Sequence, residues 1–98
     1  MKPTERDDLI RSFFEDDMAL LTAKGHDYAG TDDCLRNLSR HGLRGIIVRM
    51  GDKYERLHTL VWDALEPEVK GEAISDTLRD LRNYSFLAQI FLEGKEKP

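Results

Sequence analysis

Residues 43–65 read LRGIIVRMGDKYERLHTLVWDAL, and this stretch decides the fold that the sequence predicts. Its apolar residues recur every three or four positions, the spacing that places side chains on one face of an α-helix. The stripe is wide enough to face the core of a bundle, and its members are Leu43, Ile46, Ile47, Met50, Tyr54, Leu57, Val61 and Ala64. Gly45 and Gly51 weaken this helix slightly. The sequence therefore predicts one long amphipathic helix over residues 43–65.

Helical patterns also flank this stretch. Residues 4–24 begin with a capping threonine and repeat apolar residues at helical spacing until Gly25. A short helix is expected from Thr31 to near Gly42, and a last helix from Ile74 onward, after the proline and glycine of EPEVKGE. The residues that build this last helix at helical spacing are Ile74, Leu78, Leu81, Ser85, Ala88 and Leu92. We therefore expect an all-α fold, a helical bundle of three long helices and one short helix in a single domain. The domain spans residues 1–98, with flexible ends at residues 1–3 and 94–98.

The composition restricts the classes of function. The chain has 98 residues and a formal net charge of -4, so broad binding to double-stranded nucleic acid is not expected, because that needs a basic surface. Cys34 is the only cysteine, which excludes an intramolecular disulfide and a cysteine-based metal site. Neither a signal peptide nor a membrane-spanning run is recognisable. A cytoplasmic protein without a membrane partner is expected.

The last helix carries more apolar surface than one core stripe needs. Phe86 and Ile90 lie opposite Leu81 when each residue advances by about 100°. Trp62, on the preceding long helix, also points away from the main stripe. Either a partner subunit or the first helix must cover this second patch. We expect a homo-oligomer.

A row of acids follows one side of the last helix. Glu72, Asp76 and Asp80 are spaced by four residues, so their carboxylates lie above one another, and Asn83 falls within the same arc. Asp80 is expected at the edge of the apolar face rather than in open water. An acid in that position needs a partner, which is either a divalent cation such as Mg²⁺ or Mn²⁺ or a basic side chain.

Complementary charges occur on the preceding long helix, within the segment RMGDKYER. Arg49, Asp52, Lys53 and Arg56 fall within roughly 100° of one another, beside the core stripe. One interpretation is a polar cavity between the two helices, in which the basic groups bind phosphate and the acids bind metal. The other interpretation is a set of interhelical salt bridges, from Lys53 or Arg56 to Asp76 or Asp80, without a ligand.

The segment KGHDYAG, residues 24–30, supplies a third candidate component. Asp27 and Tyr28 lie between two glycines, where the backbone can approach a ligand closely, and Tyr28 could stack on a base. The alternative is that Tyr28 packs against the short helix and binds nothing.

Four segments in this order, KGHDYAG, LRNL, GIIVRMGDKYERL and VKGEAISDTLRDLRNYSFLA, resemble the nucleotide modification associated domain of phages and prophages. The resemblance covers residues 24–88, and its most specific parts are the DYAG segment and the two helices that follow. It implies a role in viral nucleotide metabolism inside a bacterial host. The helices are also similar to those of the all-α MazG-like nucleotide pyrophosphatases, which bind magnesium through E-x-x-E and E-x-x-D motifs.

The sequence departs from that pyrophosphatase pattern. The corresponding positions read DKYE at residues 52–55 and EAISD at residues 72–76. One extra residue rotates a carboxylate by about 100° around its helix, so the metal geometry of that family does not transfer unchanged.

Together, the residue pattern and the resemblance predict one site. The metal ligands, for Mg²⁺ or Mn²⁺, are expected to be Asp52, Glu72, Asp76 and Asp80. The nucleotide-binding residues are expected to be Asp27, Tyr28, Arg49, Lys53, Arg56 and Asn83.

Three functions remain open at this point. The first is a metal-dependent (d)NTP pyrophosphatase. The second is a non-catalytic oligomer that sequesters a nucleotide or a cyclic-nucleotide immune signal, whose affinity should survive chelation. The third is a helical interaction module in which the charges only fix the register of the helices.

Overall fold

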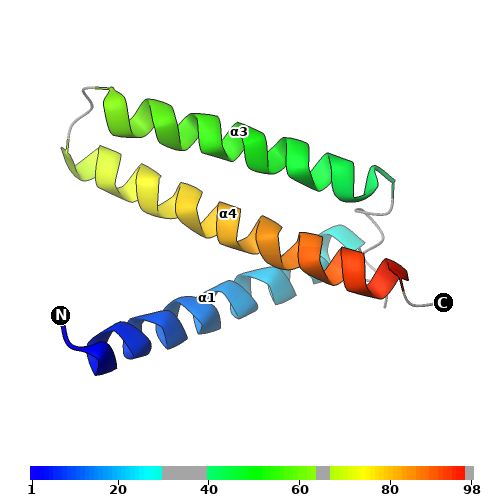
Figure 1. Ribbon diagram of the computed structural model, residues 1–98, viewed down its shortest axis with the longest axis horizontal. Helices are drawn as coiled ribbons and strands as arrows, with labels where there is room; N and C mark the ends of the chain where they lie inside the picture. Colours follow the sequence, from blue (N-terminus) through cyan, green and yellow to red (C-terminus); the bar gives the residue numbers. More distant parts are fainter. Residues whose placement is uncertain (30–39, 64–66, 97–98) are drawn as a thin grey trace. The chain divides into compact units, whose positions relative to one another are not determined.

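The computed structural model describes residues 1–29, 40–63 and 67–96, and within these the side chains of residues 1–23, 40–63 and 71–94. The described chain forms three α-helices, α1 (Pro3–Ala29), α3 (Gly42–Trp62) and α4 (Pro67–Glu96), and contains no strand (Figure 1). The all-α prediction is confirmed. The predicted short helix after Thr31 lies outside the described residues. None of the described helices is both long enough and apolar enough to cross a membrane.

The chain divides into two compact units, Met1–Asn37 and Leu38–Pro98. The described part of the first unit is α1. Its predicted end at Gly25 is wrong, because helical backbone continues through Gly25 to Ala29. A single glycine costs a helix only about 1 kcal/mol relative to alanine, and no proline follows that would stop it. Asp27 and Tyr28 therefore lie on helical backbone rather than in a glycine-flanked loop.

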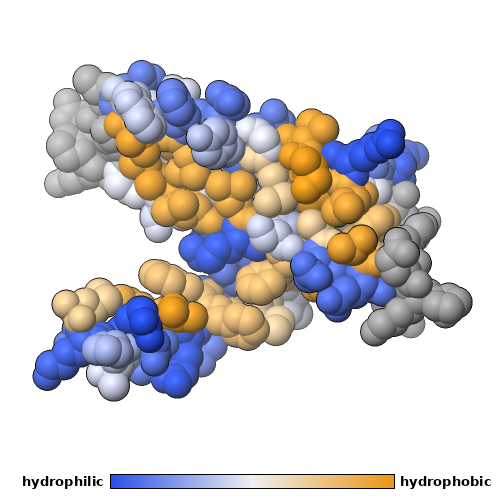
Figure 2. Space-filling model, viewed as in Figure 1, coloured by the Kyte–Doolittle hydropathy of each residue, from blue (hydrophilic) through white to orange (hydrophobic). Residues whose placement is uncertain are grey.

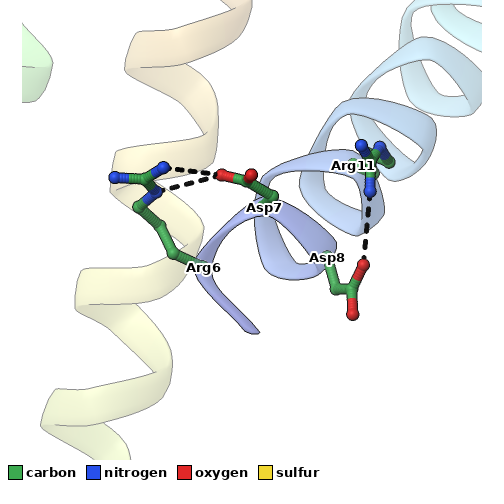
Figure 3. A network of polar contacts seen from close by, with 4 residues as sticks. All are labelled: Arg6, Asp7, Asp8 and Arg11. Atoms are coloured by element: carbon green, nitrogen blue, oxygen red, sulfur yellow. Dashed lines mark hydrogen bonds and ion pairs between the residues drawn. The ribbon is translucent and has the colours of Figure 1, made fainter. Parts of the chain in front are cut away.

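The first half of α1 carries ion pairs between neighbouring side chains. Arg6 Nη2 lies 2.9 Å from Asp7 Oδ1, and Arg11 Nη1 lies 3.3 Å from Asp8 Oδ1 (Figure 3). At least 45% of each of the four side chains is open to solvent, so each pair contributes at most about 1 kcal/mol to stability. Both pairs are therefore surface contacts within one helix.

The second unit is a hairpin of two long helices, in which α3 and α4 run antiparallel and side by side (Figure 1). α3 begins at Gly42, which has a φ of 63°. Glycine is the residue that adopts this left-handed conformation without steric cost, so the chain can turn sharply into the helix. The helix ends at Trp62, three residues before the predicted end, because Asp63 has extended backbone, with a φ of -83° and a ψ of 150°.

α4 begins earlier than the sequence indicated. Pro67 is its first residue, a position at which the fixed φ of proline suits a helix and its missing N–H costs nothing. Gly71, which was expected in the connection, lies inside the helix. α4 continues through Gly94 to Glu96, so three residues of the predicted flexible end are helical.

The core of the hairpin is small and partly polar. Ile46 and Leu60 of α3 are buried together with Thr77 and Phe91 of α4. Thr77 donates its hydroxyl hydrogen to the carbonyl oxygen of Ala73 at 2.7 Å, which satisfies the buried Oγ1.

The predicted stripes are only partly buried. On α3, Ile46 is buried and Met50 and Leu57 are half-buried, whereas Ile47 and Tyr54 are exposed. On α4, Leu78 is exposed and Thr77 is buried in its place. The predicted core face of α4 is therefore wrong by part of a turn, because the helix faces α3 with a mixed polar surface.

Apolar side chains consequently remain on the outside of the hairpin. Figure 2 shows them gathered over α3 and α4. Among the most exposed are Tyr54, at 60%, and Trp62, at 72%. Ile90, which the sequence placed on a second apolar face, is 47% exposed.

Candidate functional site

A pocket of about 360 Å³ lies between α3 and α4, within the second unit. Its volume is within the range of small-molecule sites. Two basic side chains come from α3, and α4 contributes three acids, a threonine and an alanine. The lining residues are Lys53, Arg56, Glu72, Ala73, Asp76, Thr77 and Asp80.

Lys53 and Asp80 form an ion pair across the two helices. Lys53 Nζ lies 3.0 Å from Asp80 Oδ2, and the two side chains are 31% and 27% exposed. This contact is one of the interhelical salt bridges that the sequence predicted as an alternative to a ligand site. Partial burial weakens solvent screening of the pair compared with the pairs on α1.

The remaining charged groups of the pocket are open to solvent. Arg56, Glu72 and Asp76 are all exposed. Asp76 also lies near a base of its own helix, with Arg79 Nη2 3.6 Å from Asp76 Oδ1. With three acids and two bases, the lining carries one more formal negative charge than positive charge.

Five of the predicted site residues thus line one pocket: Lys53, Arg56, Glu72, Asp76 and Asp80. Helical spacing was sufficient to predict them, because the two basic residues share one arc of α3 and the three acids share one arc of α4. Ala73 and Thr77 also line the pocket and were not predicted. Ala73 precedes Asp80 by seven residues and Thr77 precedes it by three, so both lie within about 60° of Asp80 around the helix, and this spacing was the available signal.

Other predicted residues lie elsewhere. Arg49 and Asp52 are exposed on α3 and do not line the pocket. Asn83 is 7% exposed, its Oδ1 has no hydrogen-bond partner among the described residues, and it is likewise not part of the lining. The side chains of Asp27 and Tyr28 lie outside the described residues. The two-helix part of the predicted site is therefore only partly assembled here.

The carboxylates do not form a self-contained metal site. Within the described part of the chain, no three His, Cys, Asp or Glu side chains are grouped so that they could hold a metal ion. Magnesium, however, is commonly bound through one or two carboxylates together with the phosphates of a substrate. Glu72 and Asp76, one helical turn apart at the pocket, fit that second arrangement and not a three-carboxylate cage.

Near the end of α3, two aromatic rings stack outside the pocket lining. The ring centroids of His58 and Trp62 are 4.4 Å apart, with an interplanar angle of 13°. The expectation that Trp62 points away from the core stripe is confirmed by its exposure.

Comparison with protein-family models, with curated proteins and with solved structures gives no match for this chain.

Proposed function

We propose that the pocket between α3 and α4 binds the phosphate groups of a nucleotide together with a magnesium ion. The observation that carries this proposal is the set of facing charges, Lys53 and Arg56 from one helix and three carboxylates from the other, around a pocket of about 360 Å³. Such a pairing of basic groups and carboxylates matches the chemistry of a metal-bound polyphosphate.

The side chains have different roles in this proposal. Arg56 offers a planar guanidinium, which can donate two parallel hydrogen bonds to one phosphate, and Lys53 acts as a point charge. Glu72 and Asp76 would hold the ion, and water molecules and phosphate oxygens would complete its coordination. Asp80 lies beside Lys53, where it can reach either the lysine or a cation.

The catalytic form of the proposal is a magnesium-dependent nucleoside triphosphate pyrophosphatase, in which water is consumed and a nucleoside monophosphate and pyrophosphate are released. Its support is the resemblance to the nucleotide modification associated domain and to the MazG-like pyrophosphatases, which we propose as the relatives of this chain. A bound magnesium ion would supply Lewis-acid stabilisation of the phosphoryl oxygens. Mn²⁺ satisfies the same oxygen ligands.

The second candidate is a protein that sequesters a nucleotide without cleaving it. The separation of the carboxylates favours this form, because no three of them are grouped as a metal cluster in the described chain. Lys53 and Arg56 would then provide most of the recognition, and a cyclic nucleotide would be as suitable a ligand as a triphosphate.

A thermal-shift screen tests the proposal and separates its two forms. Nucleoside triphosphates, monophosphates and cyclic nucleotides are each added with Mg²⁺ or with EDTA, because a ligand that binds the folded state raises the melting temperature. Every stabilising nucleotide is then recovered and chromatographed. Cleavage supports the pyrophosphatase, recovery of the intact ligand supports sequestration, and stabilisation by no nucleotide contradicts both.

We also propose that the chain forms a homo-oligomer through the apolar outer surface of the α3–α4 hairpin. Ile47, Tyr54 and Leu78 support this, because each is at least 45% exposed. Exposed apolar patches of this kind are typical of association surfaces. Light scattering coupled to size-exclusion chromatography should give a mass above that of one chain, and Tyr54→Glu should lower it. A monomeric mass for the unmodified protein would contradict this proposal.

A further inference from the structure

Lys53 and Asp80 neutralise each other in the pocket before any ligand is bound. Their charged atoms are 3.0 Å apart, and about 30% of each side chain is exposed to solvent. A phosphate group would need the lysine ammonium, and a divalent cation would be attracted to the aspartate carboxylate. Each ligand therefore competes with a residue of the protein for its own partner.

We propose that this ion pair makes the binding of a phosphate ligand and of a divalent cation depend on each other, an inference that rests on the proposed function. If a phosphate binds alone, Lys53 leaves Asp80, and a partly buried carboxylate loses its counter-charge. If a cation binds alone, Asp80 leaves Lys53, and the partly buried ammonium group of Lys53 loses its counter-charge. If both bind, the two side chains exchange partners and no charge is left uncompensated.

The other charged residues of the pocket also favour joint binding of a phosphate and a cation. Glu72 and Asp76 repel an anion that arrives without a cation, because the lining has an excess of one formal negative charge. Arg56 in turn repels a cation that arrives alone. The charges of the pocket therefore favour a phosphate and a cation that enter together.

In the unmodified protein, the inference predicts reciprocal linkage. A non-hydrolysable nucleoside triphosphate analogue should bind about tenfold more tightly with saturating Mn²⁺ than with EDTA, within the usual range of coupling between two ligands. Because linkage is reciprocal, the analogue should increase the affinity for Mn²⁺ by the same factor. Calorimetry measures the first affinity, and electron paramagnetic resonance of free Mn²⁺ measures the second.

Two variants separate this coupling from a simple role in metal binding. Asp80→Asn releases Lys53, so the metal-free affinity for the analogue should rise about fivefold, whereas the increase that Mn²⁺ gives should become smaller, because only Glu72 and Asp76 remain to favour the cation. Lys53→Met releases Asp80, so the affinity for Mn²⁺ without the analogue should rise. Asp76→Asn removes the same negative charge from the lining without releasing Lys53, so it should raise the metal-free affinity less than Asp80→Asn does, and an equal rise would contradict the role of the ion pair.

The matched control is Asp8→Asn, which breaks the exposed Arg11–Asp8 ion pair on α1 and should leave the linkage unchanged. Circular dichroism establishes that each variant is folded, and the measurements on the unmodified protein need no variant. Equal affinity for the analogue with Mn²⁺ and with EDTA would overturn the coupling and leave nucleotide binding standing. Failure of the analogue to bind under both conditions would overturn the proposed function as well.

Discussion

The ring of Phe91, near the end of α4, lies against Gly42, the first residue of α3. A Cβ atom at position 42 would be 3.7 Å from Phe91 Cζ and 3.8 Å from Phe91 Cε1, which are ordinary van der Waals distances. Space is therefore not what requires glycine at this position. The requirement comes from the backbone, because the φ of Gly42 is 63°.

Gly42→Ala should destabilise the protein by roughly 1–2 kcal/mol, the usual cost of the left-handed conformation for a residue with a Cβ atom. Thermal unfolding followed by circular dichroism should show a melting temperature lower by several degrees. Gly42→Asn should lower the melting temperature less than Gly42→Ala does, since asparagine tolerates this conformation better than alanine. Equal losses for alanine and asparagine would show that the backbone conformation is not the cause.

Gly51→Ala should have the opposite effect. Gly51 lies in the interior of α3, and a Cβ atom there meets no other atom within 4 Å. Replacement by alanine should stabilise the helix by about 0.5–1 kcal/mol, because alanine loses less backbone entropy on folding. The midpoint of urea unfolding measures the change, and an unchanged or lower midpoint would contradict the prediction.

Phe91→Ala should lower the free energy of unfolding far more than the same change at Leu92 does. Phe91 is 8% exposed and Leu92 is 42% exposed. Removal of a buried phenyl ring typically costs roughly 3–5 kcal/mol, which is a large part of the stability of a small domain. Leu92→Ala is the matched control and should cost less than about 1 kcal/mol. Comparable losses for the two variants would contradict the position of Phe91 in the core.

Arg56→Met should weaken nucleotide binding without destabilising the fold. The Arg56 side chain is exposed and lines the pocket, so its loss removes charge-assisted hydrogen bonds to phosphate but little packing. We expect about a tenfold loss of affinity by calorimetry, equivalent to about 1.4 kcal/mol. Arg44→Met, an exposed position of α3 outside the pocket lining, is the control. Equal effects of both variants would indicate a non-specific influence of net charge.

Sequence reasoning was most successful where a single helix determines the answer. The apolar spacing of residues 43–65 predicted α3, and the shared arcs of Lys53 with Arg56 and of Glu72 with Asp80 predicted most of the pocket lining. Such arcs depend only on the rotation per residue within one helix. They need no knowledge of the partner helix.

The failures concern helix ends and the rotation of one helix against another. The pattern of α4 favoured Leu78 as a core residue, yet Thr77 is buried and Leu78 is 45% exposed. The Lys53–Asp80 ion pair was among the salt bridges that the sequence predicted as an alternative, but the pattern of α4 alone did not show that this polar edge turns toward α3. The predicted helix end at Gly25 is wrong, because one glycine within a helix costs too little to end it.

The stacked rings of His58 and Trp62 at the end of α3 provide an intrinsic fluorescent probe. Trp62 is the only tryptophan in the chain, so all indole emission comes from one helical turn. Because the indole is 72% exposed and rests on the ring of His58, its emission depends on whether that turn keeps the two rings together. Fraying of the last turn of α3 can therefore be followed in solution without any added dye, independently of the helical signal from the rest of the molecule.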